Sequence, residues 1–309
     1  MINQKIFIAG HNGMVGSAIL RKFQSENLSN IITADKSELN LLCNNDVESF
    51  FYEKRPDVVV LAAAKVGGIQ ANIENPVSFL LENLEIQNNV IKNSIKYGIK
   101  KFVFLSSSCI YPKECKQPMN EDDILTGKLE PTNEGYALAK ITGMKLIEAY
   151  SNNSDLIATT LIPCNLYGPN DSFDLNKAHV LSSLVKRFVD AKKNNLSEVV
   201  LWGSGKARRE FMHVDDLANA VYYFLKNSTK SMTLNIGSGY DISINELASK
   251  ISQNVGFKGE ILWDSFKPEG MLRKCMDVSK MLKYGFSPII SLDKGLEQMI
   301  KIYNENYRL

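Results

Sequence analysis

A glycine-rich turn near the start of the chain places the strongest constraint on its fold. Residues 5–9 form a short apolar run that predicts a buried parallel strand, and an amphipathic helix is predicted to end near Phe23. The segment Gly10-His-Asn-Gly13-Met-Val-Gly16 lies between them. Glycines three residues apart at a strand-to-helix turn let the backbone approach a pyrophosphate, with the helix N-terminus facing the phosphates. This context favours dinucleotide binding over a simple tight loop.

Strands and helices alternate along the first half of the chain. Further apolar runs predict strands at 31–35, 57–64, 101–105 and 156–161, and the stretch 83–97 has the apolar spacing of a helix. Such alternation is typical of an α/β fold with a Rossmann-like, doubly wound parallel sheet. We therefore predict a dinucleotide-binding Rossmann domain over residues 1–165.

Beyond residue 165 the alternation becomes less regular. A helix is predicted at 179–192 and a short strand at 199–202, and short strands and helices mix from residue 233 onward. We predict a smaller C-terminal α/β substrate domain over residues 166–309, with a segment near 210–230 returning to the first domain. The basic, glycine-rich stretch 203–209 is either a clamp for a substrate phosphate or a solvated hairpin loop.

Composition narrows the class of partner. The 309 residues include 36 Lys and Arg against 34 Asp and Glu, a net charge of +2, so we expect no nucleic-acid or acidic-membrane surface. The N-terminus leads straight into a strand and no long apolar run is present, which predicts a cytoplasmic protein. The cysteines have no C-x-x-C spacing and no matching histidine cluster, so free thiols and no metal site are expected; they are Cys43, Cys109, Cys115, Cys164 and Cys275.

Two adjacent charged residues bear on the choice of dinucleotide. Asp35 follows the second predicted strand, where an acid holds the adenosine ribose hydroxyls, and this favours NAD(H). Lys36 could instead meet a 2′-phosphate, which favours NADP(H). A solvated charge pair is the third possibility. The strand at 57–64 ends in small residues, which would let either cofactor lie against the backbone.

A tyrosine and a lysine in a predicted helix suggest carbonyl chemistry. Tyr136 and Lys140 are four residues apart, so they point the same way. An ammonium beside a phenol lowers the pKa of the phenol, and Tyr136 could then exchange a proton with a carbonyl or alcohol. The alternative is an ordinary exposed pair. Ser107 or Ser108, after the strand at 101–105, could hydrogen-bond a substrate carbonyl, or they could belong to a plain Ser-rich turn.

These motifs together resemble the extended short-chain dehydrogenase/reductase superfamily and, within it, the GDP-L-fucose synthase family of GDP-4-keto-6-deoxy-D-mannose 3,5-epimerase/4-reductases. The resemblance runs from the glycine-rich turn almost to the C-terminus. The glycine turn and the Tyr-Lys pair belong to the whole superfamily, whereas Ser-Ser-Cys-Ile-Tyr-Pro and the isolated His179 are specific to the branch. The other matching segments are at 61–68, 130–136, 165–169, 202–205 and 208–211.

The resemblance implies a role for each matching residue. Tyr136 would donate a proton to the C4 oxygen, and Lys140 would tune Tyr136 and hold the nicotinamide ribose. Ser107 or Ser108 would assist at the carbonyl, and Cys109 and His179 would be the base and acid of epimerisation. The GDP-sugar would be held by Lys186, Arg187, Trp202, Arg209 and Glu269. The cofactor would be held by Gly10, Asn12, Gly13, Met14, Val15, Gly16, Asp35, Lys36, Leu61, Ala62, Ala63, Leu105, Ser106, Lys140, Pro163, Cys164, Asn165, Leu166 and His179.

The implied chemistry is coherent in its own terms. In a 4-keto sugar both C3–H and C5–H are alpha to the carbonyl, so one base and one acid can invert both centres through an enolate. A thiol is a competent base when its surroundings lower its pKa, and Cys109 follows Ser107 on the loop expected to face the carbonyl. The non-catalytic alternatives are that Cys109 is only a small buried residue and that His179 only begins a helix at the surface.

Some positions depart from the family pattern, and other functions stay open. Asn12 stands where bacterial relatives usually have a basic residue, and Gly135 stands where they usually have a proline. Asn12 and Asp35 favour NAD(H), whereas Lys36 favours the family's NADP(H).

One alternative function is a C4-reductase of another GDP-4-keto sugar, such as a GDP-6-deoxy-4-keto-heptose, with little or no epimerase activity. Another is a non-catalytic dinucleotide-binding regulator. Family members are usually homodimers, which implies an interface on the helices near 83–97 and 136–150.

Overall fold

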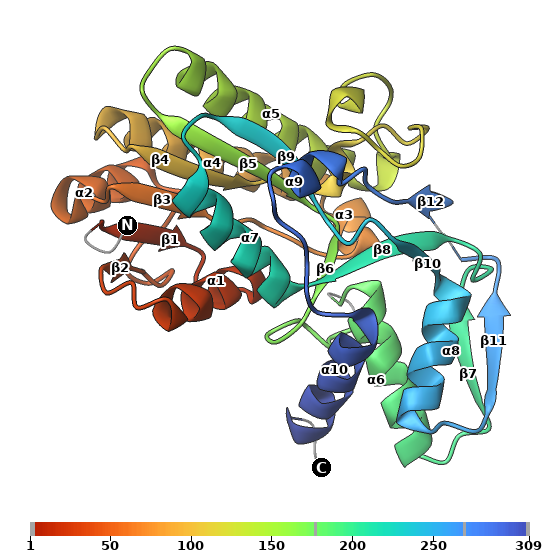
Figure 1. Ribbon diagram of the computed structural model, residues 1–309. Helices are drawn as coiled ribbons and strands as arrows, with labels where there is room; N and C mark the ends of the chain where they lie inside the picture. Colours follow the sequence, from red (N-terminus) through yellow and green to blue (C-terminus); the bar gives the residue numbers. More distant parts are fainter. Residues whose placement is uncertain (1–3, 176–177, 268–269, 307–309) are drawn as a thin grey trace.

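The computed structural model describes residues 4–175, 178–267 and 270–306, and its larger part is a six-stranded sheet (Figure 1). In spatial order the strands are β2 (Ile31–Ile32), β1 (Ile6–Ala9), β3 (Val58–Leu61), β4 (Lys101–Leu105), β5 (Ile157–Pro163) and β9 (Met232–Ile236). Every neighbouring pair is parallel. The chain order reverses between β1 and β3, which is where such sheets bind their ligands. The predicted Rossmann-like α/β fold is confirmed.

Helices cover both faces of this sheet (Figure 1). Helices α1 (Met14–Ser25) and α7 (Val214–Asn227) pack together on one face. The other face carries α2 (Asn44–Lys54), α4 (Pro76–Lys96) and α5 (Glu134–Asn152). Shorter helices lie in the connections: α3 (Ile69–Glu74), η1 (Ser108–Ile110), η2 (Glu121–Asp123), η3 (Pro131–Asn133) and α9 (Ser279–Lys283).

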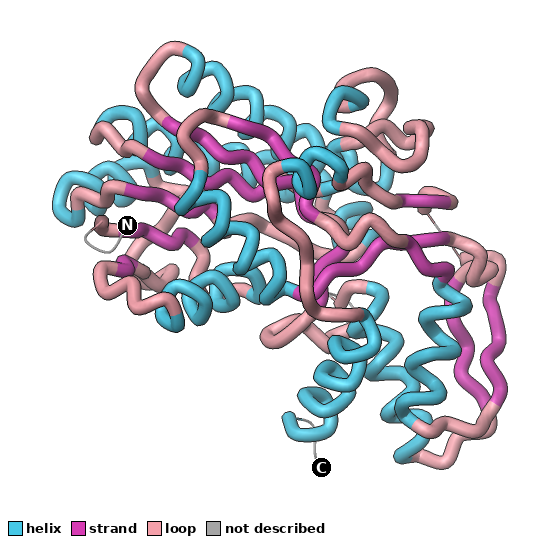
Figure 2. The backbone as a smooth tube through the Cα atoms, viewed as in Figure 1, coloured by secondary structure: helices cyan, strands magenta, loops and turns pink. Residues whose placement is uncertain are grey.

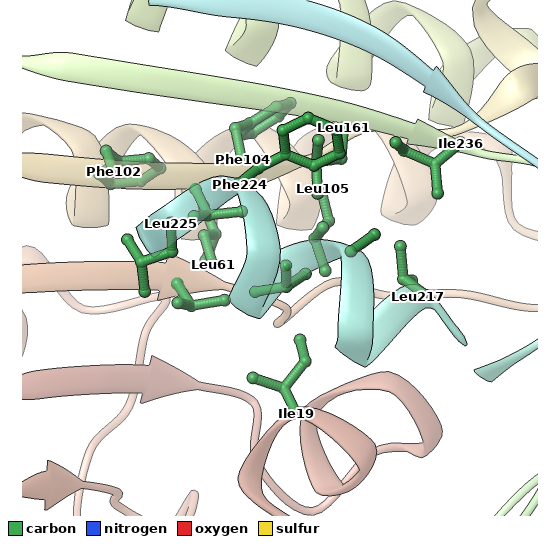
Figure 3. Close-up of a cluster of buried hydrophobic side chains, with 14 of the residues drawn as sticks. Ile19, Leu61, Phe102, Phe104, Leu105, Leu161, Leu217, Phe224, Leu225 and Ile236 are labelled. Atoms are coloured by element: carbon green, nitrogen blue, oxygen red, sulfur yellow. The ribbon is translucent and has the colours of Figure 1, made fainter. Parts of the chain in front are cut away.

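The main core lies between the sheet and its helices. Figure 3 shows Leu217, Phe224 and Leu225 of α7 directed at strand residues that include Leu61 and Leu161. All five side chains are buried. Strands β1 and β3 are buried along their whole length, which explains their unbroken apolar sequences IFIA and VVVL.

The smaller part, whose backbone is drawn in Figure 2, has a hydrophobic core of its own. Strand β7 (Glu198–Trp202) pairs in parallel with β11 (Glu260–Asp264). Helices α6 (Val180–Lys193), α8 (Ile244–Val255) and α10 (Leu292–Asn306) pack against one another beside this pair. A third sheet lies between the two parts, in the order β10 (Asp241–Ser243), β8 (Arg208–His213) and β12 (Arg273–Lys274), and β6 (Asn165–Tyr167) also pairs with β8.

Several predicted boundaries were wrong. The strand predicted at 31–35 has only two residues, and the strand predicted at 57–64 ends at Leu61. The helix predicted from residue 83 begins at Pro76, since proline fits the first turn of a helix. Residues 203–209 do not form a hairpin loop, because β7 pairs with β11 rather than with β8. None of the helices in the described ranges is both long and apolar enough to cross a bilayer.

Candidate active site

The turn after β1 is shaped by contacts that only glycine allows. Gly10 has a φ of +90°, and a Cβ added to it would lie 2.7 Å from the backbone of Ala63. A Cβ on Gly16 would lie 2.0 Å from the carbonyl oxygen of Gly10. Gly13 caps α1, and its N–H donates to that oxygen at 3.2 Å. The N-terminus of α1 therefore lies close to the end of β3, in the geometry that accepts a pyrophosphate.

The other predicted cofactor residues line the carboxyl ends of the strands. They lie in the first turn of α1 (Met14, Val15), at or after the ends of β3 (Leu61, Ala62, Ala63), β4 (Leu105, Ser106) and β5 (Pro163, Cys164), and in β6 (Asn165, Leu166). Among the described residues, the hydroxyl of Ser106 and Nδ1 of His11 are buried and lack a hydrogen-bond partner. A glycine cradle and unsatisfied buried polar atoms beside it fit a nicotinamide dinucleotide.

Asp35 lies just beyond β2, and two side chains of the glycine-rich turn reach it. Asn12 donates from Nδ2 to Oδ1 of Asp35, and Nε2 of His11 lies 3.4 Å from the same oxygen. Lys36, the next residue, is exposed. The carboxylate that would hold the ribose hydroxyls thus contacts two side chains of the turn, and the cationic Lys36 follows it in the chain.

Tyr136 and Lys140 lie one turn apart in α5. Nζ of Lys140 is 5.7 Å from the centre of the Tyr136 ring, and it donates a 2.9 Å hydrogen bond to the carbonyl oxygen of Leu105. Burial lowers the pKa of Lys140 to about 8. Burial, and then the nearby Cys109 thiolate, raises the pKa of Tyr136 well above its usual value. The predicted lowering of the Tyr136 pKa is therefore wrong, because desolvation of the phenolate raises it.

The loop after β4 presents the two serines and the cysteine. Ser107 caps η1, and its hydroxyl accepts a hydrogen bond from the N–H of Cys109 at 3.4 Å. Ser108 and Cys109 are buried, and Ser107 is half-buried. Burial raises the pKa of the Cys109 thiol, and Lys274, Ser107 and Lys140 act in the opposite direction. The expectation of a thiol with a lowered pKa is thus also wrong, again because desolvation dominates.

His179 caps the start of α6 and is exposed. The carbonyl oxygen of its neighbour Ala178 lies 3.5 Å from where a Cβ on Gly68 would stand. The start of α6 therefore lies against the loop that follows β3. His179 also acts on Asp171, whose pKa is raised by burial and lowered by the Ser182 hydroxyl and by His179.

The two predicted substrate ligands of α6, Lys186 and Arg187, have different surroundings. Nζ of Lys186 donates to Oδ2 of Asp190 at 3.0 Å and to the hydroxyl of Tyr303 at 2.8 Å. These contacts direct the ammonium toward α10. Nη1 of Arg187 donates to the carbonyl oxygen of Val200 at 3.5 Å, which places its guanidinium beside β7.

Two of the remaining predicted substrate ligands, Trp202 and Arg209, lie on strands. Trp202 ends β7 and is exposed, with Nζ of Lys267 at 5.4 Å from its ring centre. Arg209 lies on β8, and its Nη2 would be 3.5 Å from a Cβ on Gly270. Glu269 lies outside the described residues.

Sequence reasoning missed two residues of this region. Oδ1 of Asn133, at the start of α5, is buried and has no hydrogen-bond partner among the described residues. Asn133 lies inside segment 130–136, which matches the family, so the sequence could have identified it as a site residue. Lys274 acts electrostatically on Cys109 although 165 positions separate them in the chain. Nothing local in the sequence points to that neighbour.

One cavity of the structure lies away from these residues. A space of about 490 Å³ lies beside the edge strand β9, and none of the predicted site residues lines it. We locate the site by the convergence of strand ends instead, since the sheet topology and the glycine contacts identify it independently of a cavity's volume. In the ranges given above, no three His, Cys, Asp or Glu side chains gather closely enough to bind a metal ion.

Comparison with known proteins agrees with this geometry. Residues 6–237 match the NAD-dependent epimerase/dehydratase family. A protein of Arabidopsis thaliana described as putative GDP-L-fucose synthase 2 is 50% identical, over 98% of this chain and 92% of its own.

Two solved structures superpose over almost the whole chain. A GDP-6-OMe-4-keto-L-xylo-heptose reductase of Campylobacter jejuni has a TM-score of 0.92 and 33% identity, covering 99% of each chain. A GDP-L-fucose synthetase of Naegleria fowleri bound to NADP has a TM-score of 0.89 and 25% identity, covering 100% of this chain and 95% of its own.

Proposed function

Because the chain belongs to the NAD-dependent epimerase/dehydratase family, we propose that it inverts C3 and C5 of GDP-4-keto-6-deoxy-D-mannose and reduces C4 with NADPH, giving GDP-L-fucose. Identity to a putative GDP-L-fucose synthase along almost its whole length supports this substrate. The observation that carries the proposal is the convergence of Tyr136, Lys140 and Cys109 at the carboxyl end of β4. A base and a proton donor facing one carbonyl are what epimerisation followed by reduction requires.

Each residue has a role that follows from its surroundings. NADPH, when bound, supplies the hydride to C4. The raised pKa of Tyr136 keeps its hydroxyl protonated at neutral pH, so Tyr136 can give a proton to the oxygen as negative charge develops there. The Lys140 ammonium donates to the Leu105 carbonyl oxygen, and this places a cationic hydrogen-bond donor 5.7 Å from the centre of the Tyr136 ring. The Ser107 hydroxyl, on the half-buried side of the loop, assists at the same oxygen.

Epimerisation needs a base and an acid near the same ring. We assign the base to Cys109 and the acid to His179, with the enolate stabilised by the groups that polarise the ketone. Arg187, Trp202, Arg209 and Glu269 would hold the GDP-sugar. Lys186 would lie further from it, because its ammonium donates to Asp190 and Tyr303.

A C4-reductase without epimerase activity is the second candidate. The similarity to a heptose reductase at a TM-score of 0.92 favours it, since residues around the reacting ring can persist after the substrate changes. One assay separates the two candidates. The chain is incubated with GDP-4-keto-6-deoxy-D-mannose in deuterated water, with and without NADPH. Deuterium at C3 and C5 together with NADPH oxidation is the expected result; oxidation without exchange indicates the reductase, and no oxidation with any 4-keto sugar contradicts both.

We propose NADP(H) as the cofactor, with Lys36 as the contact to the 2′-phosphate. Replacing Lys36 by Met is expected to lower kcat/KM for NADPH about tenfold or more, because a hydrogen bond to a charged group is worth roughly 1.5–3 kcal/mol. NADH, which lacks that phosphate, is the internal control and should be unaffected. Equal losses with both cofactors, or a clear preference of the unaltered chain for NADH, would instead give Asp35 the dominant role.

We also propose a cytoplasmic homodimer. The five free thiols support a reducing compartment. On adjoining surfaces of α4 and α5, Val77, Leu81 and Leu138 are 73%, 51% and 40% exposed, and a second copy would cover them. Leu81→Glu is expected to halve the mass measured by light scattering. Leu282→Glu, at a residue of α9 with the same 51% exposure, is the control and should leave the mass unchanged.

A further inference from the structure

The strand β12 carries two cations that face in opposite directions. Arg273 donates to Oδ2 of Asp241, and Arg208 of the neighbouring strand donates to Oδ1 of Asp241 at 2.7 Å, so both guanidinium groups lie on one side of this sheet. Lys274 is the register partner of Arg209. Since successive residues of a strand point to opposite faces, Lys274 and Arg209 share the other side.

The residues after Lys274 are bonded to the loop that carries Cys109. The N–H of Met119 donates to the carbonyl oxygen of Cys275 at 2.9 Å, and the N–H of Asp277 donates to that of Met119 at 2.8 Å. The N–H of Cys275 donates to Oε1 of Gln117 at 2.9 Å. Three hydrogen bonds therefore fix the Lys274 segment against the chain that runs from Cys109 to Met119.

A buried carboxylate fixes the same segment from its other side. Glu210 is 1% exposed, and its two oxygens accept the N–H groups of Met276 and Gly239, each at 2.8 Å. The carbonyl oxygen of Glu210 also accepts Nδ2 of Asn165 at 2.8 Å. The backbone next to Lys274 is thus tied to β8 through Glu210, which also holds the turn before β10.

The charges around Cys109 make Lys274 its main electrostatic partner. Burial raises the pKa of the thiol, and Lys274 is the strongest of the groups that lower it, ahead of Ser107 and Lys140. Burial lowers the pKa of Lys274, and the Cys109 thiolate raises it while Arg209 lowers it further. Tyr136 and Lys140 are the further titratable groups whose pKa values the Cys109 thiolate raises. Each charged form is unfavourable alone, and the two together stabilise each other.

We propose that Lys274 is the positioning residue that stabilises the thiolate of Cys109 and so makes it a base. This inference rests on the proposed function, in which Cys109 abstracts the C3 and C5 protons. Lys274 acts through the thiolate, as a cation on the same face of the sheet as Arg209.

The thiolate can be followed without any assay of activity. The tryptic peptide 102–113 contains Cys109 as its single cysteine, so mass spectrometry gives the rate of its alkylation by iodoacetamide in the intact chain at each pH. In Lys274→Met the midpoint of this pH profile is expected to rise by about one unit or more, and the rate below the midpoint to fall about tenfold. Lys274→Arg keeps the charge and should restore most of the rate.

Two controls separate this effect from disturbed structure. Arg273→Met removes the adjacent cation on the opposite face and should leave the Cys109 profile unchanged. The buried thiols Cys164 and Cys275 report unfolding, because their alkylation would accelerate; if Lys274→Met unfolds, Lys274→Gln replaces it. An unchanged midpoint in a folded Lys274 variant, or an equal shift in Arg273→Met, overturns the proposal. A shift in a chain that shows no deuterium exchange would retain Lys274's role and reject the proposed function instead.

Discussion

Replacing Tyr136 by Phe is expected to lower kcat for ketone reduction by about 10²–10⁴-fold, the range associated with a positioned proton donor. The ring remains, so its contact with the Lys140 ammonium at 5.7 Å and the packing of α5 should survive. Only the hydroxyl that protonates the C4 oxygen is lost. Oxidation of NADPH, followed by its absorbance, measures the reduction.

Deuterium exchange in the same variant tests whether the two reactions are separable. Exchange at C3 and C5 should continue, because Cys109 and His179 are unaltered. Tyr150→Phe is a matched control, since Tyr150 is a half-buried tyrosine near the other end of α5 and should lose neither activity. Equal loss of reduction and exchange in folded Tyr136→Phe would contradict separate roles.

Replacing Cys109 by Ser should have the reverse effect. A hydroxyl is far less acidic than a thiol, so the anion that removes the alpha proton would be missing, and exchange at C3 and C5 is expected to fall about 10²–10⁴-fold. Reduction should stay within a few-fold, because Tyr136 and Lys140 remain in place. Nuclear magnetic resonance of the recovered sugar measures the deuterium.

The matched control for this variant is Cys115→Ser. Cys115 lies six residues further along the same connection and is not placed at the reacting ring, so its replacement should leave exchange intact. Full exchange in folded Cys109→Ser would remove Cys109 as the base, and with it the need for a thiolate partner at Lys274.

The sequence was sufficient for those features that local physics determines. The turn Gly10–Gly16 needed only its glycine spacing and its flanking apolar runs, and the buried strands at 6–9, 58–61 and 101–105 followed from continuous apolar residues. The spacing of Tyr136 and Lys140 on one helix was likewise a local fact. Each of these is encoded within a few residues.

The features that sequence could not predict depend on distant neighbours. The directions of the pKa shifts of Tyr136 and Cys109 were wrong, because they depend on how deeply the fold buries each group. Lys274 escaped notice because β12 has two residues and exists only through its pairing with β8. Short strands of this kind have no periodicity of their own to detect.

The position of β9 has a consequence for how this chain can be made. Its sixth strand arrives only at Met232–Ile236, after α6 and β7 of the smaller part have been synthesised and before α8, β11 and α10, and α7 precedes it by a few residues. Until then β5 is an open edge, and the apolar face that α7 covers is bare. A nascent polypeptide that ends at residue 165 is therefore expected to self-associate. A single cleavage of the chain cannot separate the larger part from the smaller, because β9 belongs to the larger part but follows β7 in the sequence.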